Sequence, residues 1–171
     1  VSFDAAGNVV VVGRRCALSS EGYATDCVGY VSLLAAADGA TIWDRDFGTA
    51  VASLVDVVAA EDGMVYAVGS IVGTIVVDSV TVSSVGDGAT DAMLLVLDAT
   101  NGVASWAATA SGSSSASSSL VEVVGDAVYM NCLRGCSTIA STASTVTVAK
   151  ESLLNGGVGG GGVAKFDTMT G

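Results

Sequence analysis

Short apolar stretches separated by polar turns dominate the chain. Residues 1–13 hold two apolar segments around a turn at 6–8 and end on Gly13. The same arrangement returns in 54–69 and again in 120–132. Segments rich in Val, Ile and Tyr that are bounded by Gly, Asn and Asp predict β-strands joined as hairpins. We therefore expect an all-β protein.

A second motif closes each of these units. It consists of an apolar strand, a turn that ends on glycine, and a tryptophan four residues later. The motif is complete at Gly39–Trp43 and at Gly102–Trp106, 63 residues apart, and it begins again at Asp167–Gly171, where the sequence ends. A pattern that recurs at a nearly constant period indicates a repeat architecture.

Each unit of about 60 residues contains four predicted strands, and the units differ mainly between their second and third strands. These variable insertions are residues 14–28, 72–90 and 133–160. Four short antiparallel strands per repeat are typical of a propeller blade. We predict β-propeller-type repeats, about three four-stranded antiparallel blades in a single repeat region, with units of approximately 1–52, 53–119 and 120–171. A closed propeller needs four to eight blades, so we expect this region to be a segment of a longer chain.

The insertions and connections carry further patterns. Residues 73–84 alternate well enough to predict a small additional hairpin. The third insertion combines a Thr- and Ser-rich run at 138–149, which is strand-like, with a glycine tract at 156–162. The serine-rich run 111–119 lies between two units, and its composition predicts a flexible loop between blades.

The repeated tryptophans and turn residues are predicted to be structural. Trp43 and Trp106 occupy one repeat position, which favours packing between adjacent blades over a ligand-stacking platform. Asp38 and Asp98 precede their turn glycines by different spacings, so only the glycines align strictly. We expect these aspartates to cap or shape the turns.

The composition is unusually apolar. Hydrophobic residues make up 51% of the chain and charged residues only 13%. So apolar a chain folds in water when its sheets are buried on both faces. The longest apolar run, 63–77, is shorter than the roughly 20 residues that a spanning helix needs and is rich in β-branched residues. We predict no membrane insertion.

The charge excludes one class of partner. The formal net charge is −11, with only six basic residues. This charge repels nucleic-acid backbones and anionic lipid surfaces. We therefore expect no nucleic-acid partner.

The chain has four cysteines: Cys16, Cys27, Cys132 and Cys136. Without histidine, their spacing suits a zinc site poorly. They lie at equivalent places in units one and three, which would not be neighbours in a propeller. Local disulfides Cys16–Cys27 and Cys132–Cys136 are therefore the preferred pairing, with free buried thiols as the alternative. Disulfides would place the protein outside the reducing cytosol, in an extracellular or cell-surface location.

The sequence contains no recognisable catalytic group. Without histidine there is no Ser-His or Cys-His pair, although a paired-carboxylate hydrolase stays formally possible. The glycines of 157–162 satisfy GxGxxG, but a strand follows them and we predict a flexible loop. Asp44 with Asp46, and Asp87 with Asp91, could offer oxygens to calcium, but we expect solvated turn acids. We predict no enzyme activity, no cofactor and no metal.

The repeats resemble a known family. Residues 65–78 and 91–98, followed by Gly102 and Trp106, resemble the SBBP-type bacterial β-propeller repeat. The Asp-x-x-x-Gly-x-x-x-Trp pattern at 98–106 is also similar to the tryptophan-docking motif of quinoprotein (PQQ-like) propellers. The resemblance implies propeller blades in secreted or surface proteins with binding or scaffolding roles. The quinoprotein branch would add a dehydrogenase, but its cofactor and calcium ligands match no position here. The long insertions and the cysteines depart from both patterns.

These observations favour an extracellular structural or interaction module of a surface coat, adhesin or filament. Its long loops would contact other copies of itself, neighbouring domains or other surface proteins. The sequence is also compatible with two alternatives. One is part of the cofactor-binding propeller of a quinoprotein-type dehydrogenase, and the other is a propeller that binds carbohydrate or peptide.

Overall fold

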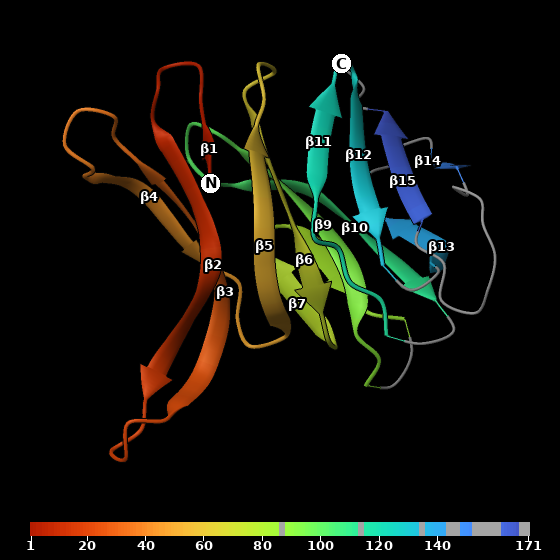
Figure 1. Cartoon of the computed structure of the whole chain (residues 1–171), viewed down its shortest axis with the longest axis horizontal. Coiled ribbons are helices and arrows are strands. Elements are labelled where there is room, and N and C mark those ends of the chain that lie inside the picture. The colour runs from red at the N-terminus through yellow and green to blue at the C-terminus, as the bar shows by residue number, and fades with distance from the viewer. Residues whose placement is uncertain (86–87, 113–114, 134–135, 143–147, 152–161, 168–171) are drawn as a thin grey trace.

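The computed structural model describes residues 1–85, 88–112, 115–133, 136–142, 148–151 and 162–167. Within these ranges all regular secondary structure is β-strand, and every strand pairing is antiparallel. The strands form three larger sheets and one separate hairpin. In Figure 1 the three sheets lie side by side in chain order, from the N-terminal unit on one side to the C-terminal unit on the other. The fold is therefore all-β with several antiparallel sheets, as the sequence predicted.

The first sheet is a simple four-stranded meander. It consists of β1 (Ser2–Phe3), β2 (Val9–Leu18), β3 (Ala24–Leu34) and β4 (Thr41–Asp46), in that spatial order. β2 and β3 are long because the first predicted insertion continues them as an extended hairpin. All four strands come from the first predicted unit.

The middle sheet contains one strand from another unit. Its own strands are β5 (Val51–Ala59), β6 (Met64–Ile71), β9 (Asp91–Asp98) and β10 (Ala104–Gly112), in that order. β13 (Cys136–Ser141), from the third insertion, pairs with the outer edge of β10. The sequence predicted four strands per sheet, so the fifth strand is a departure. It arises because an insertion pairs with the sheet of the neighbouring unit.

The third sheet consists of β11 (Val121–Val124), β12 (Ala127–Cys132), β15 (Gly162–Asp167) and β14 (Val148–Glu151), in that order. β14 also comes from the third insertion, so the strand-like run predicted at 138–149 contributes to two strands in different sheets. The place beside β15 that corresponds to β4 and β10 is therefore held by an insertion strand.

The predicted hairpin of the second insertion is present. β7 (Thr74–Val77) pairs with β8 (Val80–Ser83) to form a separate two-stranded sheet. Ile75, Val80 and Val82 are buried and belong to the core between the first and middle sheets. The alternating pattern thus places Ile75, Val80 and Val82 on the buried face of the hairpin, while Val76 is exposed.

The middle sheet is buried on both faces. Along β6, Val65 and Ala67 pack in the core shared with the first sheet, whereas Tyr66 and Val68 pack in the core shared with the third sheet. All four side chains are at most 1% exposed. β9 divides its side chains between the two cores in the same way. This burial explains how so apolar a chain forms a compact fold, and it confirms the prediction for the middle sheet.

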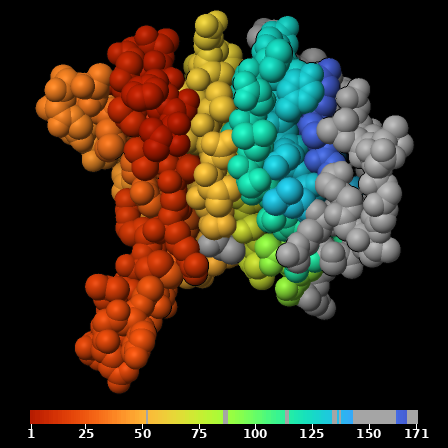
Figure 2. All heavy atoms as spheres, viewed as in Figure 1, coloured from red at the N-terminus to blue at the C-terminus, as the bar shows by residue number. Residues whose placement is uncertain are grey.

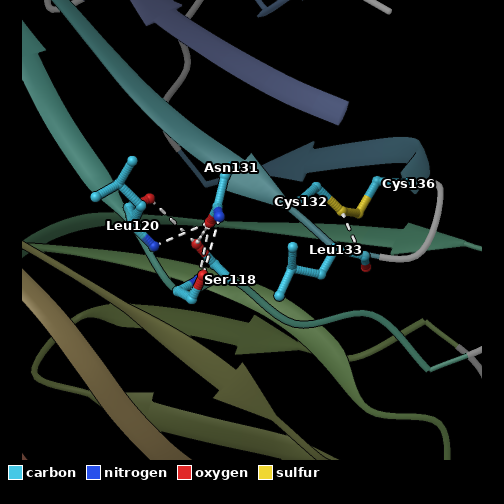
Figure 3. Close-up of a disulfide and its surroundings, with 7 residues drawn as sticks. Ser118, Leu120, Asn131, Cys132, Leu133 and Cys136 are labelled. Atoms are coloured by element: carbon cyan, nitrogen blue, oxygen red, sulfur yellow. Dashed lines mark hydrogen bonds between the residues drawn. A yellow bond between two sulfur atoms is a disulfide. The ribbon is translucent and has the colours of Figure 1, made fainter. Parts of the chain in front are cut away.

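The described part of the serine-rich connection, residues 115–119, differs from the prediction of a flexible loop. Ala116 and Ser118 are 1% and 3% exposed. The Asn131 side chain of β12 holds this connection, because its Oδ1 accepts hydrogen bonds from the amides of Ser119 (2.8 Å) and Leu120 (2.9 Å) and its Nδ2 donates to Ser119 Oγ (2.9 Å). Figure 3 displays this cluster beside the nearby disulfide. Composition alone could not reveal that an asparagine from another strand satisfies these backbone groups.

Candidate interaction surface

The two complete repeat turns have the same backbone geometry. In the first turn, the Ala35 amide donates to the Ala40 carbonyl and the Gly39 amide donates to the Ala35 carbonyl. In the second turn, the equivalent bonds run from Asp98 to Val103 and from Gly102 to Asp98. The fifth residue is Gly39 in one turn and Gly102 in the other, with φ values of +71° and +70°. This left-handed conformation favours glycine. The alignment of the two glycines therefore reflects one turn built twice.

The second turn is a docking site for a tryptophan of the first unit. The Trp43 side chain is 8% exposed, and its Nε1 donates to the Ala99 carbonyl at 2.8 Å. Its ring lies so close to Gly102 that a Cβ added at residue 102 would be 2.8 Å from ring atom Cε3. Glycine is thus required both for the turn and for the contact. This arrangement joins two units, as expected from the recurrence of the tryptophan.

A polar contact beside this indole fixes three elements together. Arg45 Nε donates to the Gly102 carbonyl at 3.0 Å, and Arg45 Nη2 pairs with Asp78 at 2.7 Å. Asp78, at the turn of the β7–β8 hairpin, also accepts from the Ala104 amide of β10 at 2.8 Å. That backbone bond, with Arg45, lowers the pKa of Asp78. Neither residue stood out in the sequence, because the three elements meet only in the fold.

The second tryptophan occupies the corresponding place in the next unit. Trp106 packs against the core of the third sheet, with its ring centroid 5.9 Å from that of Phe166. Phe166 immediately precedes Asp167, whose backbone pairs with Ala127 in β15 and β12. Gly171 lies outside the described residues. Trp43 and Trp106 therefore both reach from one unit to the next.

The predicted turn aspartates are bound to their own turns. Asp38 Oδ1 accepts from the Ala40 amide at 2.9 Å, and Asp98 Oδ1 accepts from the Thr100 amide at 2.7 Å. The hydrogen bonds from Thr100 lower the pKa of Asp98. Both carboxylates shape turns, in agreement with the sequence prediction.

Among the described residues no tryptophan covers the first turn, whose Ala36 amide donates to Asn8 Oδ1 at 3.1 Å. An added Cβ at Gly39 would meet no atom within 4 Å, and residues 36–40 are exposed. The turn that carries Gly102 is covered by Trp43, whereas its counterpart faces solvent. The first unit thus presents an open copy of a docking turn.

The outer face of the first sheet corresponds to a buried face of the middle sheet. Val9 and Val11 correspond to Val65 and Ala67, which are fully buried against the first sheet. On the outer face of the first sheet, Phe3 is 66% exposed and Ile42 is 48% exposed, while Val9 and Val11 are partly exposed. The same repeat surface is therefore covered in one unit and open in the other.

A polar cluster occupies one half of this outer face. Arg15 pairs with Asp44 and Asp46, each at 2.9 Å, and lies 4.7 Å from the centroid of the Tyr30 ring. Ser32 also hydrogen-bonds to Asp44. Burial raises the pKa of Asp44, but the bonds from Ser32 and Arg15 outweigh it and lower the pKa overall. The Asp44 and Asp46 pair considered for calcium thus binds one arginine, which offsets one of its two negative charges.

The β2–β3 hairpin extends beyond the body of the molecule as an arm, visible at the lower left of Figure 2. A disulfide between Cys16 and Cys27 joins its two strands. The tip exposes Leu18 (74%) and Tyr23 (69%). The first insertion is therefore a protruding hairpin whose two strands are cross-linked by a disulfide.

The second disulfide joins Cys132 at the end of β12 to Cys136 at the start of β13 (Figure 3). Both pairings are the local ones that the sequence favoured, and the free-thiol alternative does not apply. Disulfides persist in oxidising environments, of which the outside of the cell is one.

The remaining candidates for chemistry are dispersed. Asp91 is 1% exposed and bonds to the Val85 amide, and burial raises its pKa. Asp87 and most of the glycine tract lie outside the described residues. Within the described ranges no three His, Cys, Asp or Glu residues gather as metal ligands would. The described part of the chain also has no helix of the length and apolarity needed to cross a membrane.

Comparison with known proteins gives no match to any protein-family model, and no curated protein matches the chain.

Proposed function

We propose that the chain is an extracellular structural or interaction module of a surface coat, adhesin or filament. In this proposal its sheets are propeller-type blades related to the SBBP-type and quinoprotein-like repeats, and units associate through tryptophan-to-turn docking. Other copies, neighbouring domains or other surface proteins are its partners.

One observation supports this proposal above the others. Trp43 of the first unit covers the Gly102 turn of the second, while the equivalent Gly39 turn and the sheet face around it stay open. A face that combines exposed Phe3 and Ile42 with the Arg15 cluster resembles a protein interface, which mixes apolar area with a polar rim. The two disulfides support an extracellular setting.

The proposal is tested by the association of the full chain. Light scattering after size exclusion and electron microscopy of the same fractions should detect concentration-dependent assemblies. Ile42→Lys, on the open face, should abolish them. Val55→Lys is a matched control, because Val55 is equally apolar and 50% exposed but lies on β5 of the middle sheet. Monomers at every concentration, or equal loss in both variants, would contradict the proposal.

A further inference from the structure

β4 presents a free strand edge at the position where β10 is paired. β4 is the last strand of the first sheet and has no strand partner beyond it in the described part of the chain. The Phe47 amide donates to the Gly29 carbonyl of β3 at 2.9 Å. Because antiparallel strands alternate their bonding direction, the backbone groups of Asp44 and Asp46 point away from β3. Two donors and two acceptors therefore lie along an open edge.

The corresponding edge of the middle sheet is covered. Ala107 of β10 is 63 residues after Asp44 and holds the same repeat position. Its carbonyl accepts from the Thr142 amide at 2.9 Å, and its amide donates to Thr142 Oγ1 at 2.9 Å. β13 continues this pairing along β10. The repeat unit can thus accept an additional antiparallel strand at this position, and in the described part of the chain the middle sheet has one.

A groove lies beside the free edge. Its volume is about 540 Å³, and it is lined by residues 44–50 on one side and 74–78 of the β7–β8 hairpin on the other. Phe47 and Ile75 provide apolar lining and are 4% and 6% exposed. This volume is within the range of sites that bind small molecules or short peptide segments.

Arg15 offsets part of the negative charge beside this edge. Exposed edge strands are commonly protected from pairing by charged side chains. Asp44 and Asp46 carry such charges, but Arg15 pairs with both of them across the outer face of the sheet. The backbone edge remains accessible.

We infer that the β4 edge is a strand-addition site. Its occupant is an extended segment of a partner protein, rich in serine, threonine and β-branched residues, that pairs antiparallel with β4 as β13 pairs with β10. Main-chain hydrogen bonds to Asp44 and Asp46 provide the affinity, and small side chains fit beside the hairpin. The sequence of β13, Cys-Ser-Thr-Ile-Ala-Ser, defines this chemistry. The inference is independent of tryptophan docking on the Gly39 turn.

The test uses the full chain and a fluorescent peptide that copies residues 136–142 with Cys136→Ser. We expect saturable anisotropy and slower hydrogen exchange of the Asp44 and Asp46 amides when the peptide is bound. Asp44→Pro removes an edge donor without disturbing the β3 ladder and should weaken binding at least about tenfold. Asp44→Asn removes the charge but keeps the amide, and it should bind within about twofold of the wild type.

A second probe keeps the test decisive if Asp44→Pro does not fold. The peptide is N-methylated on alternate residues that face β4, which should abolish binding to the unmodified protein. Three outcomes overturn the inference: no saturable binding, equal binding to a folded Asp44→Pro variant, or binding without protection of the Asp44 and Asp46 amides.

Discussion

The ring of Trp43 lies directly against Gly102, although 59 residues separate them in the sequence. The contact depends on the missing side chain at residue 102 and on the hydrogen bond from the indole to Ala99. Since the same turn recurs at Gly39 without a covering ring, the molecule contains its own control for the energy of the contact.

Gly102→Ala should destabilise the protein by about 3 kcal/mol, because it combines an unfavourable positive φ with a clash against the Trp43 ring. Gly39→Ala has the same backbone cost but no clash, and it should cost about 1 kcal/mol. Urea unfolding at pH 7 gives both values. Equal losses would show that the ring does not press on residue 102.

Asp78→Asn should lower the free energy of unfolding by about 1 kcal/mol at pH 7, because the ion pair with Arg45 is lost. Asparagine tolerates the φ of +54° at this position. The pKa of Asp78 is lowered in the folded state from its ordinary value of 3.8. Its stabilising contribution is therefore complete above about pH 4 and is lost as the pH falls through the folded pKa.

The difference between Asp78→Asn and the wild type should consequently shrink as the pH falls below about 4 through the folded pKa. Urea titrations across this range check the prediction. Glu61→Gln, in the exposed turn between β5 and β6, is the control and should change stability by less than about 0.5 kcal/mol at every pH. A constant deficit of Asp78→Asn from pH 7 to pH 2 would refute the electrostatic explanation.

Asn131→Ala should destabilise the protein by about 2–3 kcal/mol, because the amides of Ser119 and Leu120 lose their acceptor. Asn131→Asp keeps an acceptor and loses only the donor to Ser119, so its loss should be smaller. Hydrogen exchange should accelerate at residues 115–120 in the alanine variant. Unchanged exchange there would restore the interpretation of this connection as a flexible loop.

Replacing Cys16 and Cys27 with serine should loosen the arm and leave the sheets intact. We expect faster exchange at the arm tip, an unchanged near-ultraviolet circular dichroism spectrum, and a loss of at most about 3 kcal/mol in stability. The Cys132→Ser, Cys136→Ser variant should leave exchange in the arm unaltered. Intact-mass measurement after alkylation, with and without reductant, checks both bridges in the wild type. Loss of the near-ultraviolet signal on removing the Cys16–Cys27 bridge would contradict a local role.

Local patterns predicted most of the strands and both disulfides, because hairpins such as 73–84 depend on neighbouring residues. The pattern also placed Gly102 and Trp43 at structural positions. It did not predict the pairing of β13 with β10, because composition does not reveal which edge an insertion strand joins. It also missed Arg45 and Asp78, because their contact exists only when three separate elements meet. Long-range hydrogen bonds are the part of the candidate surface that sequence patterns leave undetermined.

The double-sided burial of the middle sheet has a consequence for how the protein is made. During synthesis the first sheet and four strands of the middle sheet, β5, β6, β9 and β10, emerge before the strands that cover Tyr66, Val68 and Val96. Until residues 121–167 follow, this apolar face remains open to water and to other nascent chains. We therefore expect a ribosome that stalls after residue 119 to leave a product with exposed apolar surface, and slow translation of the last third to lower the yield of folded protein.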